Sequence, residues 1–217
     1  MQWNHKIFNI KEEGFEALAL EIFRFQSIEN PVYKSYLEAL KVDPLSVNSL
    51  NTIPFLPVRF FKSHTVQTGL FEPEAVFESS GTTGSINSRH GVKEILLYEQ
   101  SFINGFELFY GAINNYCIIG LLPSYIERKN SSLVYMVNKM ISISRHPESG
   151  FYLDEYEKLI KCLIKLEKRK QKTLLIGVTF ALLDFAEKYS SDTYREPFKH
   201  TIIMETGGMK GRRDEMI

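Results

Sequence analysis

Three short apolar runs separated by longer helical patterns constrain the fold of this chain most strongly. The runs lie at residues 117–123, 173–178 and 200–204, and each is rich in Ile or Leu. Continuous apolar runs of this length are typical of strands that are covered on both faces. Strands separated by helices of ten or more residues indicate an α/β fold with a mainly parallel sheet and flanking helices.

The helical patterns between these runs are amphipathic or strongly apolar. The pattern at 94–113 carries apolar residues over much of its surface, so we expect that helix to be largely buried. Asn30 followed by Pro31 predicts an N-cap and the first residue of a helix, and Ser131 or Ser132 is expected to cap another. The predicted helices cover residues 12–29, 31–40, 94–113, 131–143, 154–172 and 180–189.

Composition narrows the class of protein. The 217 residues contain 26 Lys plus Arg and 26 Asp plus Glu, so the zero formal charge gives no indication of a nucleic-acid partner. No apolar run approaches the ~18 residues that a membrane-spanning helix needs. The first residues lack the basic flank and apolar core of a secretory signal. Two cysteines in this length favour a reducing compartment, so we expect a cytoplasmic protein.

A small polar loop follows the short apolar run at 75–77 and precedes the helical pattern at 94–113. Its glycines let the backbone approach a ligand, and its hydroxyls and N–H groups can direct several hydrogen-bond donors at an anion. The anion that such loops usually bind is phosphate. The loop fits neither the Walker A motif nor the dinucleotide fingerprint. We predict a strand, this loop and then a helix. The loop consists of Ser79, Ser80, Gly81, Thr82, Thr83 and Gly84.

A second motif follows the third apolar run, where Glu205 and Thr206 lead into Gly207 and Gly208 and a basic segment ends at Arg212. Because each motif directly follows an apolar strand, we expect both at the carboxyl ends of sheet strands, where ligands bind in α/β proteins. The two motifs, in this order and with Ser88, Arg89 and His90, resemble those of LuxE-type acyl-protein synthetases. That family belongs to the adenylate-forming superfamily, and the resemblance extends from about Pro54 to the last residue.

The resemblance implies a reaction in which ATP and a carboxylic acid form an acyl-adenylate and pyrophosphate, with Mg²⁺ as the metal. The loop would hold the phosphates. Arg89 would contact a phosphate or, alternatively, form a surface ion pair. His90 would orient the acid's carboxylate or cap a turn. Glu205 is expected at the nucleotide site, with Gly207 and Gly208 as a flat wall for adenine and ribose. No metal ligand is predicted within the chain.

The chain departs from the family pattern after the Gly-Gly turn. Family members continue with a magnesium-holding segment, a ribose-binding Asp and a small C-terminal domain. We therefore expect a partial N-terminal domain over 1–217, with a helical lead-in at 1–50, a sheet-and-helix core at 51–217 and the small C-terminal domain absent. Cys117 and Cys162 lie among apolar residues and are interpreted as core residues, not as acyl acceptors. An uncovered apolar surface would favour oligomers.

Three hypotheses remain open at this stage. The first is an acyl-protein synthetase, in which a protein cysteine accepts the acyl group. The second is an acyl- or aryl-CoA ligase of the phenylacetate-ligase type, in which coenzyme A accepts it. The third is a non-catalytic nucleotide-binding or scaffold domain. A fatty or aromatic acid would suit an apolar wall, for which Phe55, Phe60 and Phe61 are candidates. The alternative interpretation is that these residues are core anchors.

Overall fold

The computed structural model describes residues 2–79, 87–122, 130–189 and 197–206. The chain divides into two compact units, Met1–Ser101 and Phe102–Ile217, here called unit 1 and unit 2. The sequence had suggested an internal boundary at residue 50. Residues on both sides of that position, such as Leu20 of the lead-in and Ile53, pack into the same small core, so the lead-in is part of unit 1.

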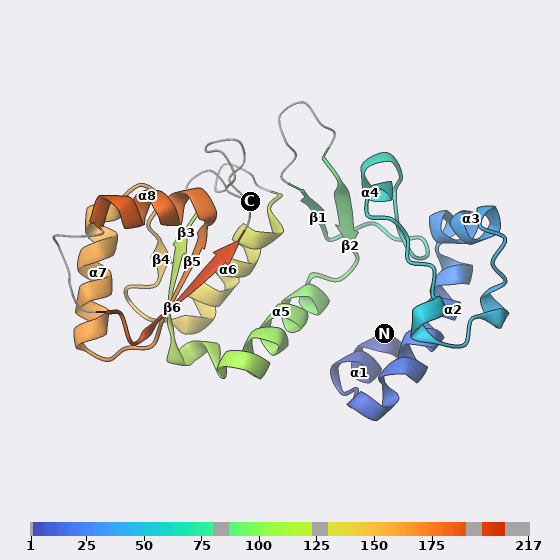
Figure 1. Ribbon diagram of the computed structural model, residues 1–217, viewed down its shortest axis with the longest axis horizontal. Helices are drawn as coiled ribbons and strands as arrows, with labels where there is room; N and C mark the ends of the chain where they lie inside the picture. The colour runs from blue at the N-terminus through green and yellow to red at the C-terminus, as the bar shows by residue number, and fades with distance from the viewer. Residues whose placement is uncertain (1, 80–86, 123–129, 190–196, 207–217) are drawn as a thin grey trace. The chain divides into compact units, whose positions relative to one another are not determined.

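Unit 2 is built around a four-stranded parallel sheet with the strand order β4-β3-β5-β6 (Figure 1). Helices α7 and α8 lie on one side of the sheet and α6 on the other. The predicted α/β fold with a parallel sheet and flanking helices is therefore confirmed. The strands are β3 (Cys117–Leu121), β4 (Gly150–Phe151), β5 (Thr173–Val178) and β6 (Thr201–Thr206); the helices are α6 (Ser132–Ser144), α7 (Tyr156–Lys168) and α8 (Thr179–Tyr189).

The two central strands form the middle of the unit 2 core. Every residue of β3 and β5 is buried, as the continuous apolar runs predicted. In the register of the sheet, Ile119 pairs with Leu175, and Leu175 pairs with Ile203. Strand β4 was not predicted, because a two-residue strand is too short to have an apolar period.

Close packing explains a glycine within β3. A Cβ atom on Gly120 would lie 2.6 Å from Cδ1 of Phe151 and 3.1 Å from Cγ1 of Val137. The absence of a side chain therefore allows the ring from β4 to lie directly over the backbone of β3, and a helix to pack beside it.

The helix caps follow the predictions, but the burial of one helix does not. Ser131 Oγ accepts a hydrogen bond from the Val134 N–H at the start of α6, as expected. Helix α5 (Ile95–Tyr110) spans the boundary between the two units and is not largely buried. In this helix Leu108 and Phe109 are 78% and 79% exposed. The residue of α5 that is buried in the unit 2 core is Phe106. The 3₁₀ turn η4 (Ile113–Asn115) follows.

Unit 1 combines short helices with a β-hairpin. Its core contains Phe23, Tyr33 and Leu37. Asn30 Oδ1 accepts a hydrogen bond from the Tyr33 N–H, which confirms the predicted cap. The elements are α1 (Gln2–Phe8), η1 (Glu12–Gly14), α2 (Phe15–Glu29), α3 (Pro31–Ala39), η2 (Pro44–Ser46), η3 (Leu50–Thr52), α4 (Phe60–Ser63), β1 (Ala75–Glu78) and β2 (Arg89–Val92).

The aromatic segment before β1 is less buried than a row of core anchors would be. Phe55 is 73% exposed, which makes its interpretation as a core anchor wrong. Phe60 is half-buried and contacts Tyr36, with 5.7 Å between the ring centroids. Pro54 and Pro57 prevent regular pairing of this stretch, so its side chains are not drawn into the core by a strand.

Within the described residues, no helix has the length and apolarity required to cross a bilayer.

Candidate functional site

The Ser/Thr/Gly loop connects the two strands of a hairpin. Strands β1 and β2 are antiparallel, with Glu78 opposite Arg89 and Phe77 opposite His90. Beyond the last pair, the Ser79 N–H donates to the Ser88 carbonyl oxygen and the Ser88 N–H donates to Ser79 Oγ, both at 3.0 Å. These reciprocal bonds hold the two ends of the loop together.

This geometry corrects two expectations about the loop. A second strand, β2, lies between the loop and α5, so the prediction of a strand, a loop and then a helix is wrong. The loop also does not follow a strand of the parallel sheet, because β1 pairs only with β2 among the described strands. Strand β2 was missed because Arg-His-Gly-Val has no apolar run or clean alternation to mark it.

Most of the predicted loop residues lie outside the residues that the structure describes. These are Ser80, Gly81, Thr82, Thr83 and Gly84, and the same holds for Gly207 and Gly208 of the second motif. The described members of the predicted site are Ser79, Arg89, His90 and Glu205. The first three belong to the hairpin in unit 1, and Glu205 belongs to unit 2.

Arg89 begins strand β2 and lies across from the carboxylate of β1. Its Nε is 3.5 Å from Glu78 Oε1, and the Arg89 side chain is 69% exposed. An ion pair as exposed as this one contributes little to stability, because water screens it. This is the surface ion pair that the sequence analysis named as the alternative for Arg89. A phosphate contact by Arg89 stays a prediction.

His90 lies within β2 rather than in a turn. Its ring faces Phe61, with 5.7 Å between the ring centroids. Neither ring nitrogen of His90 forms a hydrogen bond to another residue that the structure describes. His90 also lines the cavity of unit 1, so a ligand in that cavity would meet its imidazole.

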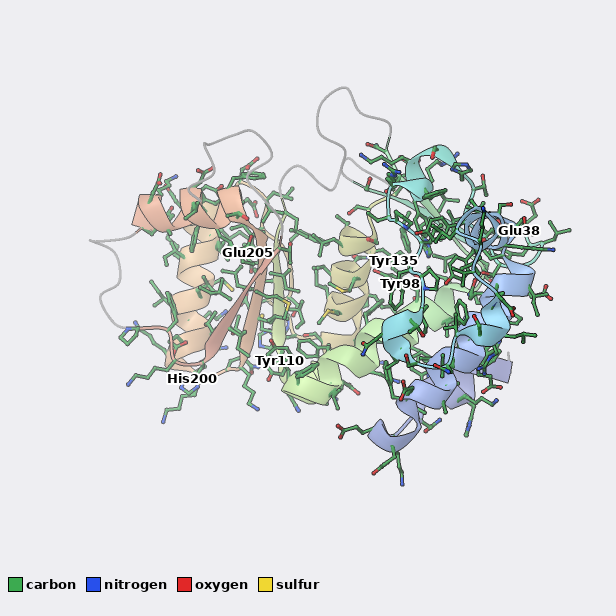
Figure 2. The ribbon with its side chains drawn as sticks, turned by 45° about the vertical axis from the view of Figure 1, so that its right-hand side comes forward. Glu38, Tyr98, Tyr110, Tyr135, His200 and Glu205 are labelled. Atoms are coloured by element: carbon green, nitrogen blue, oxygen red, sulfur yellow. The ribbon has the colours of Figure 1, made fainter. Side chains whose placement is uncertain are left out.

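The second motif begins at the carboxyl end of β6, as the sequence predicted. Figure 2 shows Glu205 near one end of this strand and His200 at the other. The Thr179 hydroxyl, at the start of α8, donates a hydrogen bond to Glu205 Oε1. Thr206 Oγ1 is buried and has no hydrogen-bond partner in the described part of the chain. A buried hydroxyl without a partner is uncommon, and this one lies at the carboxyl end of β6.

A large cavity lies in unit 1. Its volume is about 1350 Å³, and all its lining residues lie between Trp3 and Ser101. Helices α1 and α2 contribute much of its wall, together with β2 and the start of α5. Of the three residues offered for an apolar wall, Phe55 and Phe61 line it and Phe60 does not, and the part played by the N-terminal helices was not predicted. The apolar residues of the lead-in were the available signal in the sequence. They did not reveal the cavity, because an amphipathic pattern does not distinguish a cavity wall from a core face.

Two features bear on the metal and on the acyl acceptor. Across the described ranges, no three His, Cys, Asp or Glu side chains gather as they would around a metal ion. Cys117 and Cys162 are both free and buried, which confirms that they are core residues. Burial raises the pKa of the Cys117 thiol to about 12 and also raises that of the Cys162 thiol.

Comparisons with known proteins add no relative to this description. No protein-family model, no curated protein and no solved structure matches the chain.

Proposed function

We propose that this chain carries the phosphate-binding part of an ATP-dependent acyl-protein synthetase of the LuxE type. The observation that carries the proposal is the hairpin, in which the reciprocal Ser79 and Ser88 hydrogen bonds close a loop of hydroxyl and glycine residues. A loop with fixed ends loses less entropy when it wraps a ligand, so its donors can converge on phosphate oxygens at a smaller cost.

The reaction would run in two steps. A carboxylate oxygen of the acid attacks the α-phosphorus of ATP, the bond to the β-phosphate oxygen breaks, and pyrophosphate leaves. A thiolate then attacks the acyl carbonyl carbon, and AMP leaves with the former carboxylate oxygen. Mg²⁺ would neutralise phosphate charge when bound. The loop's task is to donate hydrogen bonds to the phosphate oxygens on which negative charge accumulates as pyrophosphate leaves.

The end of β6 supports a nucleotide role for the second motif. In parallel sheets ligands bind beyond the carboxyl ends of the strands, which is where Glu205 and Thr206 lie. The buried hydroxyl of Thr206 has no partner among the described residues and would suit an acceptor on the nucleotide. Gly207 and Gly208 follow directly in the sequence, where small residues would let adenine approach the backbone.

The acyl acceptor is proposed to be a thiol other than Cys117 and Cys162. A thiol with a pKa near 12 is almost entirely protonated at neutral pH and is therefore a poor nucleophile. A cysteine of another protein or coenzyme A would serve instead, and replacing one acceptor with the other in the assay distinguishes the synthetase from a CoA ligase.

A non-catalytic nucleotide-binding domain is the second candidate. The two candidates differ in turnover, because a domain that only binds ATP catalyses no acid-dependent exchange of pyrophosphate into ATP.

The test combines calorimetric titration with pyrophosphate exchange. The chain is titrated with ATP and with a non-hydrolysable acyl-adenylate analogue, and the double variant Thr82→Ala, Thr83→Ala is compared with Thr65→Ala. Thr65 is an exposed threonine of unit 1 outside the hairpin. We expect at least tenfold weaker binding in the double variant only, which corresponds to about 1.4 kcal/mol. Equal affinities for both variants, or no binding by a folded chain, would refute the phosphate site.

A further inference from the structure

The unit 1 cavity has a largely apolar and aromatic wall. Nine Trp, Phe and Tyr side chains contribute to it, and two of them, Phe15 and Phe55, are 55% and 73% exposed. Large apolar side chains that gather around a hollow without covering one another indicate a site for an apolar molecule. The nine are Trp3, Phe15, Phe23, Phe25, Tyr33, Phe55, Phe61, Phe71 and Tyr98.

The uncharged polar side chains of the wall bond largely to unit 1 itself. Thr68 Oγ1 donates to Gln26 Oε1 at 2.6 Å, and Asn30 Nδ2 lies 3.4 Å from Thr68 Oγ1. Gln67 Nε2 donates to the carbonyl oxygens of Gly69 and Phe71 at 3.2 and 2.9 Å. These groups stabilise the wall, so they are poorly placed to select the head group of a ligand.

Lys93 and His90 are the cationic or potentially cationic side chains of the wall. Lys93 Nζ lies 5.7 Å from the centroid of the Phe71 ring and forms no ion pair with a carboxylate of the described residues. Glu94 is the carboxylate among the described lining residues, and Tyr33 and Tyr98 complete the titratable groups. An anionic head group would therefore be attracted by Lys93 and repelled by Glu94.

We propose that the unit 1 cavity binds an amphipathic monocarboxylate, with its apolar body against the aromatic wall and its carboxylate on Lys93 and His90. The identification of this ligand as the acid to be activated rests on the proposed function. Binding itself does not, because it requires neither ATP nor the loop. The volume of about 1350 Å³ exceeds that of ordinary ligand pockets, which run to roughly 1,000 Å³, so a long or bulky apolar body fits.

The proposal gives the N-terminal helices a role in selecting the ligand. Trp3 of α1 and Phe15 and Phe25 of α2 line the cavity from the lead-in, whereas Lys93 follows β2, the strand that leads out of the loop. The apolar body would therefore contact the lead-in, and the carboxylate would contact the hairpin side of the cavity.

The test uses Trp3, the single tryptophan of the chain, as a reporter that lines the cavity. Its emission is recorded during titration with decanoate, decanol and decyltrimethylammonium, all below their micellar concentrations and without ATP. These probes share the apolar chain and differ in the charge of the head group. We expect saturable emission changes, with decanoate binding most tightly and decyltrimethylammonium most weakly.

Three variants locate the head group. Lys93→Met should weaken decanoate binding roughly fivefold, the effect of a charge-assisted contact reduced by solvent exposure, and should leave decanol binding unchanged. Glu94→Gln should strengthen decanoate binding by roughly twofold, because it removes a repelling charge. Lys62→Met, at an exposed lysine of α4 that does not line the cavity, is the matched control.

The outcomes separate this inference from the proposed function. Equal affinity for the three probes, no change in Trp3 emission, or equal effects of Lys93→Met and Lys62→Met would overturn the cavity assignment. Charge-selective decanoate binding that depends on Lys93 supports it, even if acid-dependent pyrophosphate exchange is never observed. Exchange that proceeds equally well in Lys93→Met would refute the identification of the cavity ligand as the activated acid and leave the proposed function standing.

Discussion

A buried carboxylate on α7 connects that helix to the start of β6. Glu167 is 8% exposed, and its carboxylate accepts hydrogen bonds from the N–H groups of Lys199 and His200 at 2.6 and 3.0 Å. The Thr201 hydroxyl lies 3.4 Å from the second oxygen, Oε2. One side chain therefore fixes the backbone that enters β6, more than thirty residues further along the chain.

Replacing Glu167 should destabilise unit 2. In Glu167→Ala two backbone donors lose a charged acceptor, and each bond of this kind contributes about 1.5–3 kcal/mol. Because Lys199 is exposed and its N–H can turn to water, we expect a total loss of about 2–3 kcal/mol rather than the full sum. Glu167→Gln keeps one acceptor oxygen and should cost about 1 kcal/mol.

Urea unfolding followed by far-UV circular dichroism measures these differences as shifts of the midpoint. Glu157→Gln on the same helix is the matched control, since Glu157 is exposed, and its effect should stay within about 0.5 kcal/mol. If Glu167→Ala unfolded at the same urea concentration as the control variant, the carboxylate would not hold the entry to β6 and the reasoning would fail.

Two further predictions concern the core of unit 2. Gly120→Ala should destabilise unit 2 by about 1–3 kcal/mol, because the added Cβ would lie 2.6 Å from the Phe151 ring; an unchanged urea midpoint would contradict this packing. Cys117 and Cys162 should react with a disulfide reagent at pH 8 at least a hundredfold more slowly in the native chain than in urea, since burial protects both thiols and their raised pKa values leave little thiolate; rapid native labelling would contradict it.

The strands of the parallel sheet could be predicted because their signal is local. The runs at 117–122 and 173–178 are apolar at nearly every position, and a segment that is covered on both faces must be apolar on both. The caps at Asn30 and Ser131 were predictable for a similar reason, because a cap depends on one side chain and the backbone three residues away.

The hairpin and the cavity could not be predicted in the same way. Strand β2 forms because Arg89–Val92 pairs with Ala75–Glu78. Its four residues are too few to show the alternation of apolar and polar side chains that marks a strand in a sequence. The exposure of α5 depends on which parts of it reach a core, and its sequence alone suggested burial. For Arg89 the structure adds the facing Glu78, a partner that is eleven residues away in the sequence.

The sequence by itself determined the alternation of strands and helices and the polar loop, since apolar period, cap chemistry and loop composition are properties of neighbouring residues. Tertiary structure decided that the loop closes a hairpin and that Glu205 meets Thr179. It also decided that side chains from Trp3 to Ser101 surround one cavity. These arrangements depend on contacts between residues far apart in the chain. The free energy of such contacts cannot be inferred from the pattern of neighbouring residues.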